Sequence, residues 1–164
     1  MSIGEGVVTN YATARGRDYP ALRQFTVFLE NRVGQLLEVV RRFEKSEVHI
    51  AALSINDATE CAFVRFILSQ PERGREILER AGLSIIETDI LGIELPETAH
   101  PLRRICETLL QAEINIVQSY PLLAAPRGQA AAAFMVDDME RAIETLSNQG
   151  LYLLNEDDLL KEFE

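Results

Sequence analysis

The sequence contains an internal repeat in which a strand, a helix and a second strand recur 66 positions further along the chain. Apolar residues alternate with other residues in FTVFLE (25–30) and again in LGIELP (91–96), and this period of two predicts a strand. Behind each strand the apolar residues keep helical spacing, which predicts an amphipathic helix. The two stripes are Leu36, Val39, Val40 and Phe43, and Leu102, Ile105, Cys106 and Leu109. A fold for this chain must therefore be built from two similar units.

The second half of each unit also recurs. Short apolar segments at 48–50 and 114–116 predict a second strand, and 62–68 and 132–136 predict a third. The second hairpin is two residues longer and contains the turn residues Pro126-Arg127-Gly128, whereas the first turns near Asn56-Asp57. Helices expected over 72–81 and 138–149 each end before a glycine, Gly82 and Gly150, and a last strand is expected from Leu83 and from Leu151.

The order of predicted elements is β-α-β-β-α-β, twice. Because βαβ crossovers are right-handed, both helices of a unit lie on the same side of its antiparallel sheet. We therefore predict an α+β chain of two ferredoxin-like repeats, with residues 1–21 as a leader, 22–89 as repeat 1 and 90–164 as repeat 2. Units of this size gain stability by packing on each other or on a second chain, so a homodimer is expected.

Composition restricts the partners. The net charge is -10 and the sequence pI is about 4.7, which disfavours nucleic acid and anionic membrane surfaces. No window is long and apolar enough to predict a membrane span, so a cytoplasmic location is expected. Cys61 and Cys106 have no metal-ligand or disulfide spacing, and we expect buried free thiols.

The sequence offers no catalytic set. It has only two histidines, His49 and His100, and no Ser/His/Asp or Cys/His arrangement can be argued from them. Its carboxylates are typical of solvated helix faces, and no glycine-rich phosphate loop is present. We therefore predict no catalytic residues, no metal site, no cofactor and a protein that is not an enzyme.

The segment that joins the first strand to the first helix is distinctive: Glu30-Asn31-Arg32-Val33-Gly34-Gln35-Leu36. It resembles the N/D-R-x-G-x-L loop of ACT domains. Glycine permits a close backbone turn there, and the first amide groups of the following helix have no partner within the helix. Such N–H groups, at the positive end of the helix dipole, suit a carboxylate ligand. Glycine and asparagine are also ordinary turn residues, so a purely structural loop is the alternative.

The resemblance implies an amino-acid ligand held at an interface between two domains. Carried over by position, the ligand-binding residues are Asn31, Arg32, Val33, Gly34, Gln35 and Leu36 of the loop, with His49 and Ile50 at the start of the second strand. His49 stands where family members often have asparagine, and Val33 where they usually have proline. In repeat 2 the loop becomes Glu97-Thr98-Ala99-His100-Pro101-Leu102 and lacks the asparagine and glycine.

Repeat 2 thus offers only a possible second site, at Thr98, His100 and Asn115. Thr98 is a candidate cap for the following helix, and Pro101 suits its first position. If this loop binds no ligand, repeat 2 serves as the packing partner of repeat 1.

The resemblance predicts a non-catalytic regulatory protein that binds a small molecule, an amino acid, at a domain or subunit interface. One alternative is a regulatory subunit of an amino-acid biosynthetic enzyme such as acetohydroxyacid synthase, with the enzyme on another chain. The other is a structural or interaction module without ligand. An enzyme on this scaffold is disfavoured because no residues with catalytic logic are found.

Overall fold

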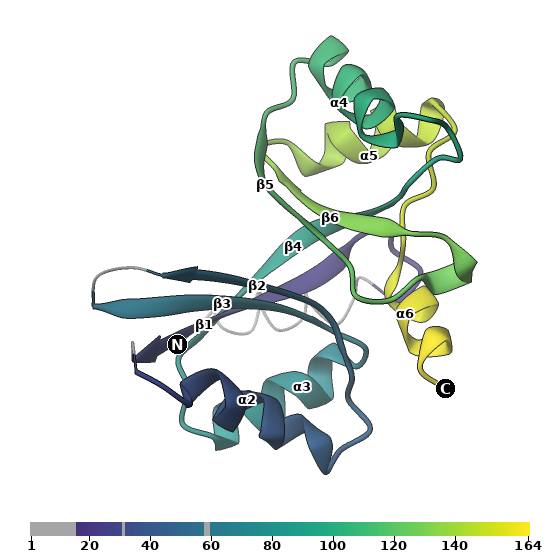
Figure 1. Cartoon of the computed structure of the whole chain (residues 1–164). Helices are drawn as coiled ribbons and strands as arrows, with labels where there is room; N and C mark the ends of the chain where they lie inside the picture. The colour runs from purple at the N-terminus through teal and green to yellow at the C-terminus, as the bar shows by residue number, and fades with distance from the viewer. Residues whose placement is uncertain (1–15, 31, 58–59) are drawn as a thin grey trace, which may run out of the picture.

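A computed structural model describes residues 16–30, 32–57 and 60–164 of the chain. The elements follow the predicted order with two differences: the last strand of repeat 1 and the first strand of repeat 2 form one continuous strand, and the last strand of repeat 2 is reduced to a bridge (Figure 1). The strands are β1 (Leu22–Glu30), β2 (Ile50–Asp57), β3 (Cys61–Leu68), β4 (Ile85–Glu94), β5 (Ile116–Pro121) and β6 (Ala131–Val136). The helices are α2 (Gln35–Glu44), α3 (Pro71–Arg80), α4 (Pro101–Gln111), α5 (Met139–Asn148) and α6 (Glu156–Glu162), with a short turn η1 (Pro126–Gly128) in the second hairpin.

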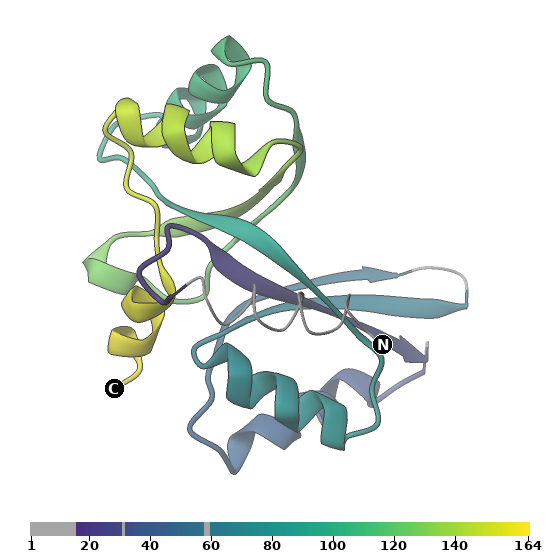
Figure 2. The same cartoon turned by 180° about the vertical axis from the view of Figure 1, so that it is seen from behind.

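The six strands form one antiparallel sheet in the order β2-β3-β1-β4-β6-β5. The two repeats share β4, which pairs with β1 through residues 85–90 and with β6 through residues 91–94. Figure 2 shows β4 crossing from one half of the molecule to the other. The predicted limit between residues 89 and 90 falls within this strand. The domain limits stay a prediction, and residues 1–15 of the predicted leader lie outside the described part of the chain.

Each repeat packs its two long helices on one face of its part of the sheet, as predicted. Helices α2 and α3 cover the repeat 1 half, and α4 and α5 cover the repeat 2 half, at opposite ends of the molecule (Figure 1). Alternating strand residues supply the apolar layer beneath them, because successive side chains of a strand point to opposite faces. In repeat 1 these include Phe25, Val27, Val64 and Phe66, and in repeat 2 Leu91, Ile93, Ala132 and Phe134.

On the face of the sheet opposite the helices, the edge strand β2 contacts the residues that follow the other edge strand, β5. Ala52 of β2 forms a bridge with Leu122, and the Leu123 amide donates a 2.7 Å hydrogen bond to the carbonyl of Ala51. The core between the repeats is made of small and apolar side chains from both halves: Leu22, Ala51, Ala52, Ile67, Ile90, Tyr120, Ala131, Ala133, Leu154 and Leu159. The repeats are therefore joined by backbone pairing and by a shared core.

The end of repeat 2 differs from the prediction. The strand expected from Leu151 is reduced to one bridge, between Ile93 and Leu153, and the chain then forms α6, which the repeat does not predict. Asn155 and Asp158 form a capping box that starts this helix. The C-terminal residues are thus used to contact repeat 1 instead of lengthening the sheet.

Two local predictions can be compared directly with the structure. Gly82 and Gly150 follow their helices with φ of 74° and 77°, which confirms the predicted left-handed C′ position. Cys106 is exposed and Cys61 is half-buried, so the prediction of two buried thiols is wrong. Cys106 is exposed because α4 turns only part of its apolar stripe inward: Ile105 and Leu109 are buried, whereas Leu102 is 53% exposed. Cys61 is the first residue of β3, at the end of the strand.

Candidate functional site

The loop of repeat 1 leaves the start of α2 open. Gly34 caps α2 in the left-handed region with φ of 90°, and no side chain caps the helix. A Cβ at Gly34 would meet no atom within 4 Å, and the neighbouring Val33 is fully exposed. Arg32 pairs with Glu30 at 3.3 Å, while Asn31 lies outside the described residues. The amides of Arg32 and Gln35 already donate to the carbonyls of Glu30 and Arg32 at 2.9 and 3.4 Å, so anion capture at this loop would use the other described amides at the helix start.

The other predicted residues of repeat 1, His49 and Ile50, lie at the opposite end of the sheet. The loop follows Glu30, which pairs with Cys61, whereas Ile50 pairs with Leu68 at the far end of β3. Seven residues of strand separate the two levels, roughly 23 Å. Within one chain these residues do not meet around one small molecule.

His49 instead contacts the C-terminal segment. Its ring stacks on the ring of Phe163, with centroids 4.7 Å apart and an angle of 6° between the planes. Its backbone amide donates to the Ser69 hydroxyl at 2.9 Å. The side chain thus has a packing role whether or not it also meets a ligand.

The loop of repeat 2 shows the same separation. Thr98 and His100 are exposed beside the start of α4, and Asn115 is exposed before β5. His100 occupies the cap position of α4 without a side-chain hydrogen bond, so Thr98 does not cap this helix. Asn115 contacts the residue after β6, because its backbone N–H donates a 3.0 Å hydrogen bond to Asp137 Oδ1.

An apolar groove, which the motif does not predict, lies beside this second loop. It has a volume of about 590 Å³ and is bounded by the end of β4, the start of α4 and the β5–β6 hairpin. A second hollow of about 520 Å³ includes His100 and shares Leu95 and Leu102 with the first. The lining of the first, larger groove includes Ser119, Pro121, Leu122, Leu123, Ala124, Ala125 and Ala130. The signal in the sequence was the apolar run Leu122 to Ala125, where a hairpin ordinarily carries polar turn residues.

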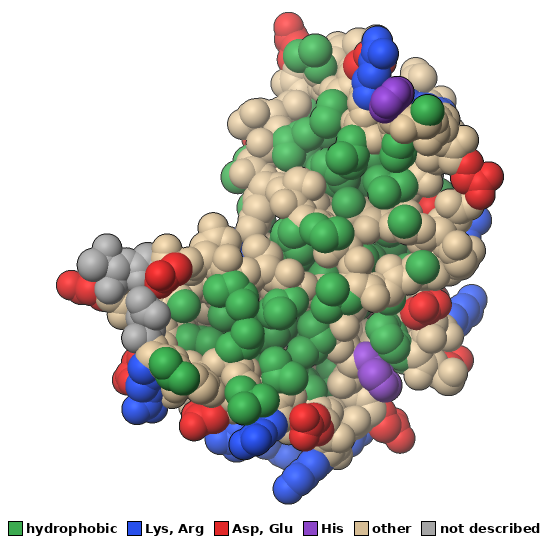
Figure 3. All heavy atoms as spheres, viewed as in Figure 1, with side chains coloured by type: hydrophobic (Ala, Val, Ile, Leu, Met, Phe, Trp, Pro, Cys, Tyr) green, Lys and Arg blue, Asp and Glu red, His purple; other side chains and the backbone are tan. Residues whose placement is uncertain are grey.

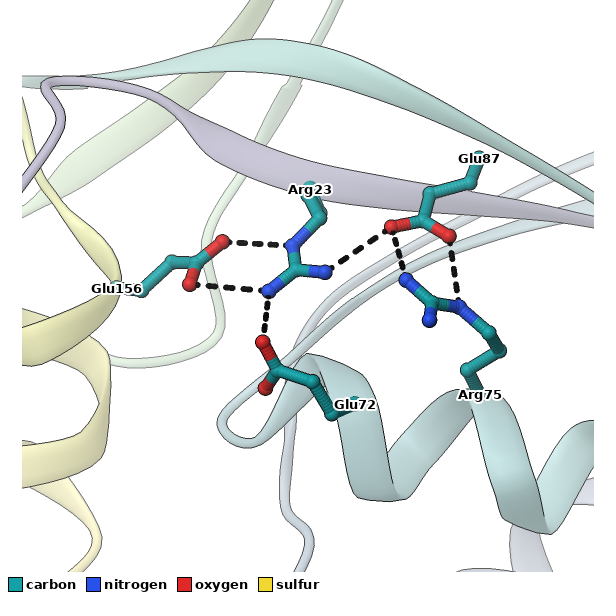
Figure 4. Close-up of polar contacts among 5 residues, drawn as sticks. All are labelled: Arg23, Glu72, Arg75, Glu87 and Glu156. Atoms are coloured by element: carbon teal, nitrogen blue, oxygen red, sulfur yellow. Dashed lines mark hydrogen bonds and ion pairs between the residues drawn. The ribbon is translucent and has the colours of Figure 1, made fainter. Parts of the chain in front are cut away.

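A buried arginine joins the C-terminal helix to repeat 1 (Figure 4). Arg23 of β1 is 8% exposed, and its Nε donates to Glu156 of α6 at 2.7 Å. The same guanidinium pairs with Glu72 of α3 and with Glu87 of β4, and Arg75 binds both oxygens of Glu87 at 2.8 and 2.7 Å. Arg23 thus connects β1 with α3, α6 and β4, and Arg75 of α3 adds a second cation at Glu87.

The network shifts the titration of its members. Burial by itself would lower the pKa of Arg23, but the hydrogen bonds to Glu156 and Glu72 outweigh burial and raise this pKa. Burial would raise the pKa of Glu72, yet the hydrogen bond from Arg23 holds that pKa below its ordinary value. Both groups are therefore charged at neutral pH, which suits a structural ion-pair network.

The described residues show neither a metal centre nor a membrane helix. No group of three or more His, Cys, Asp or Glu side chains in residues 16–30, 32–57 and 60–164 is placed to hold a metal ion. Over the same residues, no helix combines the length and the apolar character needed to cross a bilayer.

Comparisons with known proteins agree with this architecture. A family model described as an ACT domain pair matches residues 21–163. Protein BT0572 from Bacteroides thetaiotaomicron is similar in structure, with a TM-score of 0.77, 27% identity and coverage of 86% of this chain and 96% of that chain.

A second similar structure is more distant in sequence. The regulatory subunit of aspartate kinase from Thermus thermophilus has a TM-score of 0.55, 11% identity and coverage of 88% of this chain and 93% of that chain, which shows a shared fold. A search of curated protein sequences finds no match. With nearly the whole of its described length matched by one family model, the chain belongs to the ACT domain pair family.

Proposed function

We propose that this protein is a non-catalytic regulatory protein that binds an amino acid at the loop of repeat 1. The observation that carries the proposal is the uncapped start of α2 at Gly34, in a chain whose residues 21–163 match the ACT domain pair. Amides at a helix start, together with the helix dipole, stabilise a carboxylate. Arg32, Val33, Gln35 and Leu36 surround this position, and Asn31 completes the proposed set.

We also propose that the site is completed by a second copy of the chain. His49 and Ile50 lie roughly 23 Å along the sheet from the loop of their own repeat. One small ligand can therefore contact both only if the loop belongs to one copy of the chain and His49 and Ile50 belong to another. Figure 3 shows hydrophobic side chains gathered across one face of both repeats. Exposed apolar side chains of the molecule include Ile55, Leu102, Val117 and Leu123. Burial of such surface favours a homodimer.

The proposed regulation acts on a target enzyme. The fold is shared with a protein named as a regulatory subunit of aspartate kinase, and this likeness supports a search for a partner enzyme of amino-acid biosynthesis. Acetohydroxyacid synthase is a further candidate partner of that class. The ligand acts on such an assembly only through its different affinities for two states.

Thermal unfolding of the full chain with each of the twenty amino acids at millimolar concentration tests the proposal. A ligand at one hundred times its dissociation constant adds about 2.7 kcal/mol of stability. For a chain of this size that raises the Tm by about 5 to 11 °C. No rise with any amino acid would contradict the ligand class.

Variants at Val33 test the location, because this side chain is fully exposed and makes no packing contribution. Val33→Glu places a carboxylate beside the helix start and should repel the ligand carboxylate, whereas Val33→Lys should not. Ala99→Glu in the loop of repeat 2 is the matched control. Equal ligand-induced Tm shifts in all three variants would remove the proposed pocket.

A further inference from the structure

The face of the sheet opposite the helices carries an arginine with two buried donor atoms that have no hydrogen-bond partner among the described residues. Arg65 lies on β3, in the middle of the three strands β2, β3 and β1. Its Nε and Nη1 atoms are buried, and neither makes a hydrogen bond with the described residues. Arginine stays charged at every ordinary pH, so it cannot relieve this situation by losing a proton. A buried charge without a partner is costly, and native structures normally provide one.

The residues around Arg65 are suited to a polar ligand. The strand register places Thr26 of β1 directly opposite Arg65 on one side and Ser54 of β2 opposite it on the other. Side chains directly opposite in an antiparallel pair have Cβ atoms about 4.5 to 5.5 Å apart. Two hydroxyl-bearing residues therefore lie beside Arg65 on the same face of the sheet. One position along on the same face, Phe28 and Phe63 form an edge-to-face pair with centroids 5.1 Å apart.

Repeat 2 contributes a side chain to the same region. Tyr120 of β5 donates its hydroxyl to Gln24 Oε1 at 2.6 Å, and Gln24 in turn donates to Thr88 at 3.3 Å. Burial raises the pKa of Tyr120, while the charge of the nearby Arg65 opposes this increase. The tyrosine hydroxyl thus stays neutral at physiological pH and supplies no negative charge to Arg65.

The register places no carboxylate of the described strands next to Arg65 on this face. Glu30, the acidic residue of β1 that shares the face, lies four residues beyond Thr26, roughly 13 Å away. Glu30 is also 78% exposed and pairs with Arg32. The charge of Arg65 is therefore not balanced by the strands around it.

We propose that Arg65, with Thr26 and Ser54 opposite it on the neighbouring strands, is a binding site for a small oxyanion, a carboxylate or phosphate group, at the junction of the two repeats. Guanidinium groups form strong charge-assisted hydrogen bonds with both kinds of anion. The site is separate from the loop at Gly34, which follows the end of β1, and it does not depend on the amino-acid site proposed there. Its ligand would contact repeat 1 through Arg65 close to the contact that Tyr120 makes from repeat 2.

The direct test follows the Nε–Hε signals of arginine in 15N-labelled full-length protein. The Arg65 signal is assigned by its loss in Arg65→Lys, and sodium acetate and sodium phosphate are titrated against sodium chloride of equal ionic strength. A saturable shift of the Arg65 signal with acetate alone assigns a carboxylate site, with phosphate alone a phosphate site, and with both a general oxyanion site. A shift no larger than that of Arg42, an exposed arginine of α2, overturns the proposal.

Thermal unfolding gives an independent readout. Arg65→Met keeps most of the side-chain volume and removes the unpaired charge, so in chloride its Tm should exceed that of the unaltered protein and should not respond to either oxyanion. Arg42→Met should show neither effect. A lower Tm for Arg65→Met, or a failure to fold, would mean that the guanidinium already makes stabilising contacts, and this result overturns the proposal.

Discussion

The buried ion pair between Glu156 and Arg23 should determine whether α6 stays attached to repeat 1. Their side chains are 6% and 8% exposed, and two hydrogen bonds of 2.7 and 3.2 Å join them. Removing one partner of a buried pair costs about 3 to 5 kcal/mol, because the remaining charge loses its partner. Glu156→Gln leaves Arg23 with Glu72 and Glu87, so we expect the low end, about 3 kcal/mol.

This loss should lower the Tm by about 6 to 12 °C, since 1 kcal/mol corresponds to about 2 to 4 °C in a chain of this length. Differential scanning calorimetry measures it. The control is Glu107→Gln, which removes a pair with Arg103 at 2.7 Å whose side chains are 54% and 74% exposed, and its Tm should not change measurably. If Glu156→Gln melts within about 2 °C of the unaltered protein, the pair does not hold the C-terminal helix and the reasoning fails.

Three further perturbations test other parts of the structure. Glu72 has a lowered pKa in the folded protein, so its contribution to stability is present above its unfolded pKa and is lost as the pH falls through the folded pKa. Below about pH 4, the Tm of Glu72→Gln should therefore decline less steeply with falling pH than the Tm of the unaltered protein. Tyr120→Phe leaves the buried acceptor of Gln24 without its 2.6 Å donor and should cost about 1 to 3 kcal/mol in urea unfolding. Leu159→Ala opens a cavity where the side chain is 1% exposed and should cost about 2 to 5 kcal/mol by the same measurement.

Each of these predictions has a result that contradicts it. Parallel pH curves for Glu72→Gln and the unaltered protein would show that Arg23 does not stabilise the Glu72 carboxylate. Tyr152, 36% exposed, is the matched control for Tyr120, and equal costs of the two Tyr→Phe changes would refute the buried hydrogen bond. Leu110→Ala, at a side chain 74% exposed, is the control for Leu159→Ala; equal effects would mean that α6 does not seal the core.

The repeat and its elements could be predicted from the sequence because they depend on local periodicity. Alternation of apolar residues in 25–30 and 91–96 arises because one face of each strand packs on the core. Glycine at 82 and 150 arises because the chain adopts a left-handed conformation after each helix. The loop at Gly34 was also found, since its signature is a contiguous motif. The placement of its described residues beside an uncapped helix start agrees with that signature, while their role in binding stays a prediction.

Local periodicity and one contiguous motif therefore predict the fold class, the order of the elements as far as α5 and one candidate loop. Three features appear only once the chain is folded: β4 serves both repeats, α6 turns back onto repeat 1, and His49 lies far from its own loop and against Phe163. Tertiary contacts also bring three carboxylates to Arg23 and leave Nε and Nη1 of Arg65 without a hydrogen-bond partner among the described residues. Periodicity in the sequence shows which face of a helix or strand is apolar. It does not show contacts between residues more than a hundred positions apart, such as Arg23 and Glu156, because these depend on how the two repeats pack together.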